Sequence, residues 1–315
     1  MKRLLFAAGL LLALPGPEAA VRAQQPAACD RACLDGMLSR FLDAVAAEDP
    51  ARAPLAIGFR QTQNSLLTPA GAGVWQTLSA LGRSPRRYFD PVTGNAVFFG
   101  VVTDGGQPAV ASVRVRVENG AITEAEHLVV RSFNGSSLDN LKTPRPGLLT
   151  EIPPAQRAPR EVLLAIGMTY YDSIEQSSGD ATPFADDCER RENGMITAGG
   201  TGTGLDGQPR LGCHAQMDSR TFTYIDSIDF RRVWIADPVT GLVFGLSQFR
   251  HSMKDKQITV IGRDGKPTTR DVAFNPFDLP AAHIFKVRDN RIHEIEALGF
   301  MVPYMSKGGW SDFAR

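Results

Sequence analysis

Asp90-Pro91-Val92-Thr93-Gly94 recurs unchanged as Asp237-Pro238-Val239-Thr240-Gly241. Each copy follows an Arg-Arg pair and an aromatic residue, and each precedes an apolar run typical of a β-strand. A five-residue identity in matching context indicates an internal duplication. We therefore expect two copies of one domain, and we look for function where the copies differ. The pentapeptide itself reads as a turn, in which Asp bonds the backbone two residues ahead.

The match continues on both sides of the pentapeptide. An offset of 129 residues aligns Phe41, Asp43, Pro54 and Asn64 with Tyr170, Asp172, Pro183 and Asn193. An offset of 170 aligns Val117, Ile122, Glu124, Glu126 and Leu128 with Val287, Ile292, Glu294, Glu296 and Leu298. The rising offset predicts two insertions in the second copy. We expect domain 1 at residues 24–142, a Pro-rich linker at 143–158 and domain 2 at 159–315.

Residues 1–23 have the pattern of a signal peptide. Lys2 and Arg3 precede the apolar stretch Leu4–Leu14, and Val21-Arg22-Ala23 is a small-residue cleavage site. The apolar stretch is too short to span a bilayer, and no later segment is a candidate. The sequence predicts an exported chain, periplasmic or extracellular, with no membrane partner.

The charge balance gives no reason to expect nucleic acid as a partner. The whole chain has 34 basic and 34 acidic residues, and loss of residues 1–23 would remove three of the former and one of the latter. The remaining net charge, near −2, lacks the excess of positive charge that binds phosphate backbones.

Four cysteines, an even number, predict disulfides in an oxidising compartment. We prefer the pair Cys188–Cys213, because both residues flank the first insertion of the second copy. Cys29 and Cys33 lie one helical turn apart, a spacing at which a disulfide between them has tight geometry. Only His214 lies near these cysteines, so we expect no metal site. The Gly202–Gly207 stretch fits a dinucleotide pattern literally but does not follow a strand in a βαβ unit, and we expect no cofactor.

Each copy is expected to begin with a helix and to continue into strands. Apolar residues recur at helical spacing from Leu34 to Val45 and from Leu163 to Ile174. The expected strands are Ala96–Val102, Ala109–Val117 and Ile122–Arg131 in the first copy, and Val243–Phe249, His283–Val287 and Ile292–Phe300 in the second. Helices ahead of an antiparallel meander indicate an α+β fold. The second insertion, Ser252–Pro280, is expected to form a hairpin of Gln257–Ile261 with Thr268–Val272.

The stretch Asn119–His127 resembles the final hairpin of the NTF2-like, or SnoaL-like, superfamily. The second copy is similar to a narrower family of secreted fungal and bacterial proteins with tandem NTF2-like domains and no assigned function. The residues that carry this likeness are Cys188–Gly194, Cys213, Arg231–Trp234 and Phe285–Val287. The resemblance implies two tandem cone domains, each a curved antiparallel sheet packed against N-terminal helices, with a pocket at the open end. Such pockets host cofactor-independent isomerases, hydrolases, cyclases, dehydratases and lyases, while other members only bind or dimerise. No family active-site motif maps onto this chain.

His283 is the most informative difference between the copies. Val113, Val115 and Val117 alternate with arginines, which directs the valines to the core and the arginines outward. The second copy has His283 where the first has Val113, and imidazole suits acid–base work near neutral pH. The alternative is a core histidine bonded to the backbone.

Other candidates surround this position. Strict alternation places Ile292, Glu294, Glu296 and Leu298 on one face, where Glu296 could partner His283; the alternative is pairing with the outward arginines. Arg191 and Glu192 stand where the first copy has Thr62 and Gln63. Arg191 could stabilise an anion and Glu192 could line the pocket; the alternative is that the two residues form a surface ion pair. The remaining predicted ligand-binding residues are Tyr171, Trp234 and His251.

Two functions follow from this sequence. The first is a cofactor-independent lyase, isomerase or dehydratase that acts on a small apolar or aromatic compound in the domain 2 pocket. His283 would be its proton shuttle, Glu296 the partner base and Arg191 the anion stabiliser. The alternative is a non-catalytic extracytoplasmic protein that binds a small ligand or is stabilised by pseudo-dimer contacts between its own domains.

Overall fold

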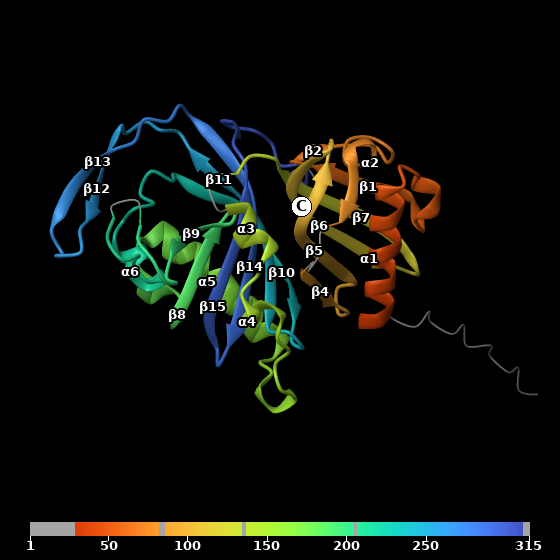
Figure 1. The fold of residues 1–315 in the computed structure, drawn as a ribbon, viewed down its shortest axis with the longest axis horizontal. Helices are drawn as coiled ribbons and strands as arrows, with labels where there is room; N and C mark the ends of the chain where they lie inside the picture. The colour runs from red at the N-terminus through yellow and green to blue at the C-terminus, as the bar shows by residue number, and fades with distance from the viewer. Residues whose placement is uncertain (1–28, 82–85, 134–136, 205–206, 311–315) are drawn as a thin grey trace, which may run out of the picture.

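A computed structural model describes residues 29–81, 86–133, 137–204 and 207–310. The predicted signal peptide, residues 1–23, lies outside these ranges. The described residues form two seven-stranded sheets and a separate two-stranded hairpin. Figure 1 shows the two sheets side by side, the first in orange to olive and the second in green to blue. The predicted class, α+β with two curved sheets that pack against helices, is confirmed.

Domain 1, as we call the first sheet and its helices, consists of α1 (Arg31–Ala46), η1 (Pro50–Arg52), β1 (Leu55–Gln63), β2 (Leu66–Leu67), α2 (Val74–Thr77), β3 (Leu78–Leu81), β4 (Arg86–Asp90), β5 (Asn95–Asp104), β6 (Gln107–Glu118) and β7 (Ala121–Val130). Its strand order is β2-β1-β7-β6-β5-β3, and β4 also pairs with β5. The connection to the second sheet contains α3 (Ser137–Lys142), α4 (Pro146–Leu149) and η2 (Pro154–Gln156).

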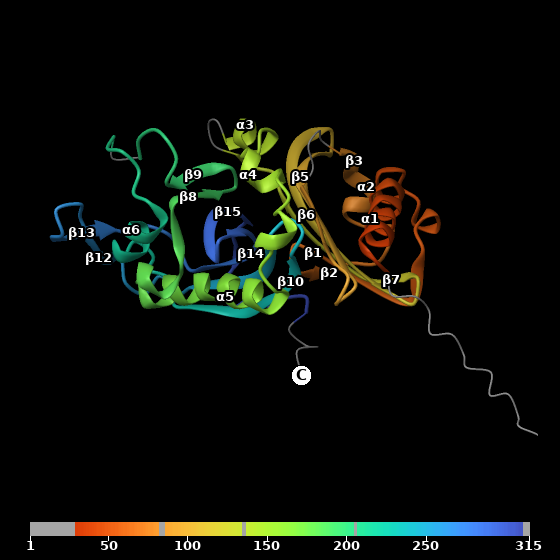
Figure 2. The ribbon, with the colours of Figure 1, turned by 90° about the horizontal axis from the view of Figure 1, so that it is seen from below.

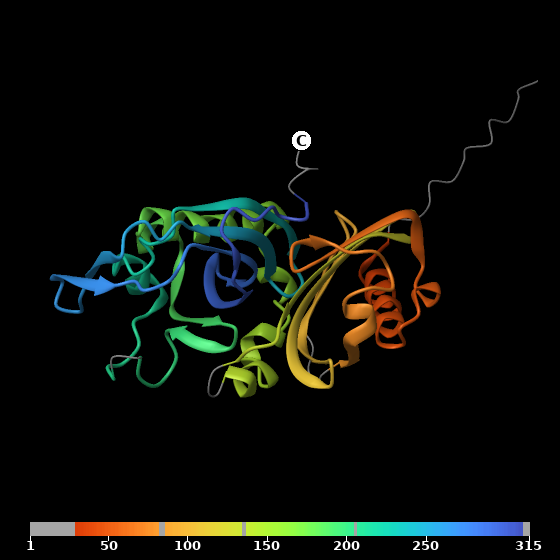
Figure 3. The same ribbon diagram turned by 90° about the horizontal axis from the view of Figure 1, so that it is seen from above.

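Domain 2 repeats this arrangement with α5 (Arg160–Gln176), η3 (Gly179–Ala181), β8 (Phe184–Glu192), β9 (Met195–Ala198), α6 (Cys213–Asp218), β10 (Ser227–Asp237), β11 (Leu242–His251), β12 (Gln257–Ile261), β13 (Pro267–Asp271), β14 (Phe277–Arg288), β15 (Arg291–Gly299) and β16 (Val302–Pro303). Its strand order is β10-β11-β14-β15-β8-β9, and β16 pairs with β14. The second insertion forms the expected hairpin, β12–β13, which projects from the end of domain 2 farthest from domain 1 (Figure 3).

The first helix of each copy lies on the inner face of its sheet. The Asp30 carboxylate accepts a hydrogen bond from the Cys33 amide, which caps α1, and its apolar face is buried from Leu34 to Val45. In domain 2, α5 buries Leu163 and Ile174 in the same way and ends at Ser177, which has a left-handed backbone conformation. Figure 2 shows the sheet of domain 1 between α1 on one side and domain 2 on the other.

One strand in each sheet runs parallel to its neighbour, a feature that sequence analysis did not predict. Strand β1 pairs in parallel with β7, and β8 pairs in parallel with β15. Residues conserved between the copies fix this strand at its ends. The Asn64 side chain exchanges two hydrogen bonds with the backbone of Val129, and Asn193 does the same with Gly299. The matched asparagines therefore hold the parallel strand in register.

The outer faces of the two sheets pack against each other. A buried apolar cluster joins Val97, Phe99 and Val110 of domain 1 to Phe244 and Ile284 of domain 2. Of the two arginines predicted to point outward, Arg114 is fully buried beside Glu124 and Glu126, whereas the Arg116 side chain is 42% exposed and pairs with Glu118. Sequence analysis left such pairing open for the counterparts of these glutamates in the second copy, Glu294 and Glu296.

Charged contacts cross between the domains in matching pairs. Arg31 of α1 bonds Asp237 at 2.6 Å, and its counterpart Arg160 of α5 bonds Asp90 at 2.7 Å. Each aspartate also accepts the amide of the second residue ahead within its own Asp-Pro-Val-Thr-Gly turn, at 3.1 Å. The repeated pentapeptide is thus the predicted turn and also a contact between the domains.

Candidate functional site

Domain 2 contains a cavity of about 290 Å³ between its sheet, α5 and the segment 222–225, and Ser132, Phe133 and Ser137 of the preceding chain complete the wall. Aromatic side chains form much of its wall: Phe222, Tyr224, Phe249 and Phe277. Two charged side chains and two imidazoles interrupt this apolar lining: Arg190, Glu192, His251 and His283. An apolar hollow with a few convergent polar groups is the usual form of a small-molecule site.

Arg190 carries the positive charge of the cavity. It lies on β8 opposite Ile295, a core residue of domain 2, so that both side chains point to the inner face. Its guanidinium donates to the Tyr170 hydroxyl at 2.7 Å and pairs with the Glu192 carboxylate at 2.5 Å. Burial alone would lower the pKa of Arg190, but Glu192 and Tyr170 raise it, so the guanidinium stays charged.

His283 is an electrically neutral group at the base of the cavity. Its ring lies between Tyr170, Tyr171 and Phe249, with the Tyr171 hydroxyl 3.4 Å from Nδ1. Burial, and then the charge of Arg190, lower the pKa of His283 to about 3. An imidazole with this pKa is uncharged near neutral pH, so it serves as a hydrogen-bonding group and holds a proton poorly.

His251 is the second neutral imidazole of the wall. Its ring stacks on Phe277 with centroids 4.0 Å apart and on Tyr224 at 5.6 Å. Its Nδ1 is buried and has no hydrogen-bond partner among the described residues. Burial lowers the pKa of His251 to about 4, which again favours the uncharged ring.

The corresponding space in domain 1 is filled by side chains. Trp75 of α2 is fully buried and donates its indole N–H to Gln61, which is the counterpart of Arg190. His127, the counterpart of Ala297, stacks on Phe41 with centroids 5.7 Å apart. Domain 2 has Ala297 on the wall of its cavity instead. The two domains therefore share a sheet but differ in what fills its inner face.

The predicted partnership of His283 with Glu296 is wrong. His283 pairs across strands with Ala297, whereas Glu296 pairs with Ile284 on the opposite face. There the Glu296 carboxylate bonds Arg86 of domain 1 at 2.7 Å, and both side chains are buried. A bulge at His293 shifts the alternation after Ile292, which invalidates the strict period of two assumed for this strand.

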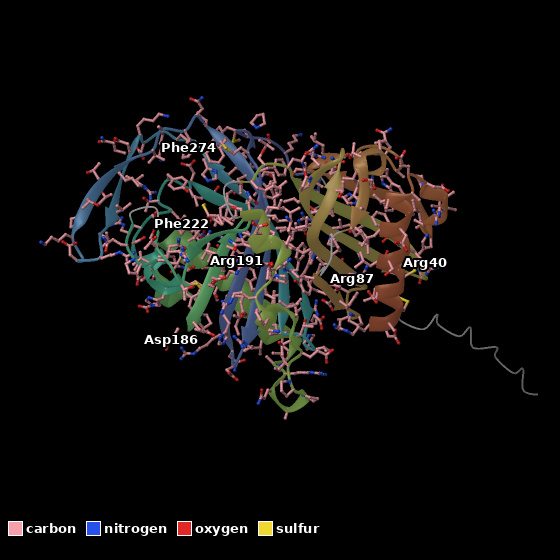
Figure 4. All side chains as sticks on the ribbon, in the orientation of Figure 1. Arg40, Arg87, Asp186, Arg191, Phe222 and Phe274 are labelled. Atoms are coloured by element: carbon pink, nitrogen blue, oxygen red, sulfur yellow. A yellow bond between two sulfur atoms is a disulfide. The ribbon has the colours of Figure 1, made fainter. Side chains whose placement is uncertain are left out.

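Arg191 and Trp234 also lie away from the cavity, contrary to prediction. Arg191 bonds Glu189 at 2.7 Å and the backbone carbonyl of Asn140, on the side of domain 2 toward domain 1 (Figure 4). Trp234 is 42% exposed in a different hollow that also contains Trp310. Both side chains point to the outer face of the sheet, whereas the side chains that line the cavity point to its inner face.

The other predicted residues lie at the cavity. His283, Glu192 and His251 line it, and Tyr171 contacts His283 from behind. Sequence reasoning missed Arg190 and the aromatic wall. The offset of 129 residues aligns Gln61 of the first copy with Arg190 of the second. This difference lies one residue before the candidates Arg191 and Glu192. The wall residue Phe222 lies between Asn193 and Asp237, where the offset between the copies changes, so the alignment gives it no fixed counterpart in domain 1.

The predicted disulfide Cys188–Cys213 is present, and it joins β8 to the first turn of α6 beside the cavity. A second disulfide joins Cys29 to Cys33. No group of three or more His, Cys, Asp or Glu side chains within the described ranges is arranged to hold a metal ion. Within the same ranges, no helix is both long enough and apolar enough to cross a membrane.

Comparison with known families and proteins gives one family match. Residues 156–299, which are most of domain 2, match the family described as Domain of unknown function (DUF8021). A search of curated proteins returns no significant match.

The solved structures similar to this chain include NTF2-like proteins. An NTF2-like protein of unknown function from Cytophaga hutchinsonii shares 13% identity, covering 30% of this chain and 88% of its own, with a TM-score of 0.26. A putative polyketide cyclase from Xanthomonas campestris shares 16% identity over 44% of this chain and 90% of its own, with a TM-score of 0.27. A putative ketosteroid isomerase from Kribbella flavida shares 10% identity over 50% and 90%, with a TM-score of 0.27.

Proposed function

We propose that the cavity of domain 2 binds a small, flat, largely apolar or aromatic compound that carries a carbonyl or enol oxygen. We propose further that the protein converts this compound without a cofactor, as a lyase, isomerase or dehydratase. The observation that supports this most is the buried guanidinium of Arg190, which lies in an aromatic cavity beside the Glu192 carboxylate and the neutral ring of His283.

Each polar group has a role in this proposal. The Glu192 carboxylate accepts a proton from the carbon next to the carbonyl, and the C–H electron pair moves toward the carbonyl oxygen. Arg190 and the neutral imidazole of His283 stabilise the negative charge that develops on this oxygen, an effect that is larger where water is excluded. Return of the proton to another carbon completes an isomerisation, and departure of a leaving group completes an elimination.

The second candidate is a protein that binds such a compound and does not convert it. The low pKa of both cavity histidines favours this candidate, because neither ring stores a proton near neutral pH. Glu192 then serves only to neutralise Arg190. The two functions differ in whether bound ligand exchanges protons with water.

Proton exchange separates the two candidates. Purified protein is incubated in D₂O with 1-tetralone or 1-indanone, and deuterium uptake beside the carbonyl is followed by NMR. The enzyme proposal predicts protein-dependent uptake that Glu192→Gln lowers by at least about 100-fold. The matched control is Glu189→Gln, which lies on the same strand but faces away and pairs with Arg191.

Uptake that is equal in the Glu192→Gln and Glu189→Gln variants excludes Glu192 as the base. Binding without uptake, measured by titration calorimetry on the same ketones, supports the non-catalytic candidate. Absence of both binding and uptake across a panel of aromatic ketones, enols and alcohols contradicts the proposed ligand class.

We also propose that the two domains form a pseudo-dimer within one chain and that the protein is exported. Matching contacts such as Arg31–Asp237 and Arg160–Asp90 support the first, because a two-fold interface uses each contact twice. The two disulfides support the second. On this view domain 1 supports domain 2 and has no ligand of its own.

A further inference from the structure

The domain 2 cavity continues outward into a second hollow of about 860 Å³, which we call the vestibule. The two spaces share five wall residues: Ser137, Glu192, Met195, Phe222 and Tyr224. The vestibule itself is defined by Arg210, Arg263 and Arg270. A molecule longer than the inner cavity would extend into this hollow.

Both insertions of domain 2 meet at the vestibule. Arg210 comes from the first insertion, and Arg263 and Arg270 belong to the second, with Arg270 on β13. The Arg263 guanidinium donates to the Pro209 carbonyl, which links one insertion to the other. Domain 1 has neither insertion, so the vestibule, like the open cavity, is confined to the second copy.

Among the residues that the structure describes, the vestibule wall has three arginines and one carboxylate. Arg210 donates to the backbone carbonyls of Gly199 at 3.0 Å, Thr203 at 2.8 Å and also Thr201, and Arg270 donates to the hydroxyl and carbonyl of Thr221. Neither arginine forms an ion pair with a carboxylate among the described residues. Glu192 is the one acidic residue of the described vestibule wall, and its carboxylate pairs with Arg190.

We infer that the ligand of domain 2 carries an anionic group, a carboxylate, sulfate or phosphate, that lies in the vestibule between Arg210 and Arg270. Arginine presents a planar set of donors that matches such anions. The apolar body of the same ligand occupies the inner cavity, so this inference rests on the proposed function. It narrows the ligand class to amphipathic organic anions.

A continuous path of side chains connects the two ends of this ligand. The Arg270 guanidinium lies 6.0 Å from the ring centre of Tyr224, and Tyr224 stacks on His251 of the inner cavity. Phe222 lies under the guanidinium of Arg190 at 4.9 Å and also lines the vestibule. Holding the anion at the outer end directs the opposite end of the ligand toward Arg190 and His283.

Two fluorescent probes with the same apolar body test this inference. 1-Anilinonaphthalene-8-sulfonate carries one sulfonate, and N-phenyl-1-naphthylamine is its neutral counterpart. The wild-type protein should bind the sulfonate roughly 10-fold more tightly than the neutral probe at low salt. Arg270→Gln and Arg210→Gln should each remove most of this preference and leave the affinity for the neutral probe unchanged.

Two controls locate the binding. Arg52→Gln combined with Arg291→Gln removes two exposed charges far from the vestibule, and this pair should keep the preference. Ala297→Phe fills the inner cavity with a ring, as His127 does in domain 1, and should abolish binding of both probes. If Arg210→Gln weakens the neutral probe as well, the loop it ties is disturbed, and Arg270→Gln alone decides.

The outcomes separate the two proposals. Equal affinity for the two probes in the wild type, or a preference unchanged by Arg270→Gln, overturns the anionic ligand and leaves the cavity as a site for neutral compounds. Probe binding that Ala297→Phe does not affect, for either probe, contradicts the cavity as a binding site, and the vestibule inference falls with it.

Discussion

At the residue scale, single exchanges between the two copies distinguish the inner faces of the two domains. Arg190 replaces Gln61 and Ala297 replaces His127, and these changes substitute an open, charged cavity for a packed core. His283 replaces Val113 on the adjacent strand. Val113 faces His127 in domain 1, and His283 faces Ala297 in domain 2, so each domain has one histidine at this pair of positions. The histidine lies on β7 in domain 1 and on β14 in domain 2, where it lines the cavity.

The buried histidines predict a loss of stability in acid. Burial lowers the pKa of His127 and His251 to about 4 and of His283 to about 3, whereas the unfolded chain binds these protons near pH 6.5. Between pH 6.5 and 4 the unfolded state therefore holds more protons, and the free energy of unfolding falls as pH falls, by about 1.4 kcal/mol per pH unit for each ring.

The buried carboxyls of Glu294 and Glu296 have raised pKa values, which make the free energy of unfolding change with pH in the opposite direction. A comparison of wild type with a histidine variant removes their contribution, because both proteins contain them. His127→Gln lies outside the cavity and should reduce the dependence of unfolding free energy on pH by about one proton. Urea unfolding at several values between pH 7 and 5 measures this slope. An unchanged slope in the variant contradicts the assignment of His127 as a neutral buried ring.

At the element scale, local sequence patterns predicted α1, α5, the central strands of each sheet and one hairpin, but not the relations of these elements in space. The valine face of β6 and the hairpin β12–β13 follow from periodicity and turn residues, which act over a few neighbours. The parallel strand β8 depends on a partner about 100 residues away, and the His293 bulge depends on pairing with β14. Glu296 was misplaced for this reason, and Arg190 was missed because β8 was not recognised as a strand.

The disulfide Cys188–Cys213 joins β8 to α6 beside the cavity and closes a loop with a sequence separation of 25 residues. Replacing both cysteines with alanine should lower the free energy of unfolding by about 3 kcal/mol. It should also weaken binding of the neutral naphthylamine probe, because Phe222 follows α6 directly. Cys29 and Cys33 are separated by only four residues, so the same replacement there should cost less and leave probe binding intact. Equal effects of the two replacements would show that the Cys188–Cys213 bond does not organise the cavity.

At the scale of the whole molecule, the two sheets are joined by buried ion pairs that occur once in each direction. Arg86 of domain 1 bonds Glu296 of domain 2, and Arg232 of domain 2 bonds Glu126 of domain 1. Arg86 and Arg232 hold equivalent register positions opposite Phe99 and Leu246, and the two glutamates are equivalent under the 170-residue offset. This reciprocity is what the pseudo-dimer proposal requires.

Removing one partner of a buried pair leaves a charge without compensation. Glu296→Gln and Glu126→Gln should each lower the free energy of unfolding by roughly 3 to 5 kcal/mol, because each leaves an interface arginine without its carboxylate partner. Urea unfolding followed by tryptophan fluorescence and by circular dichroism should show one shared transition for both domains. Separate transitions, with only one shifted by Glu296→Gln, would contradict an interface that couples the two halves.

The central claim is that domain 2, and not domain 1, holds a ligand between Arg190 and His283. Its most direct test is a crystal of the protein soaked with a brominated aromatic ketone such as 6-bromo-1-tetralone, with bromine located by anomalous scattering. We predict one strong peak per chain inside the cavity lined by Phe249 and Ala297, and none on the inner face of domain 1. A strong peak in domain 1 or beside Trp310, with none in the domain 2 cavity, would contradict the account.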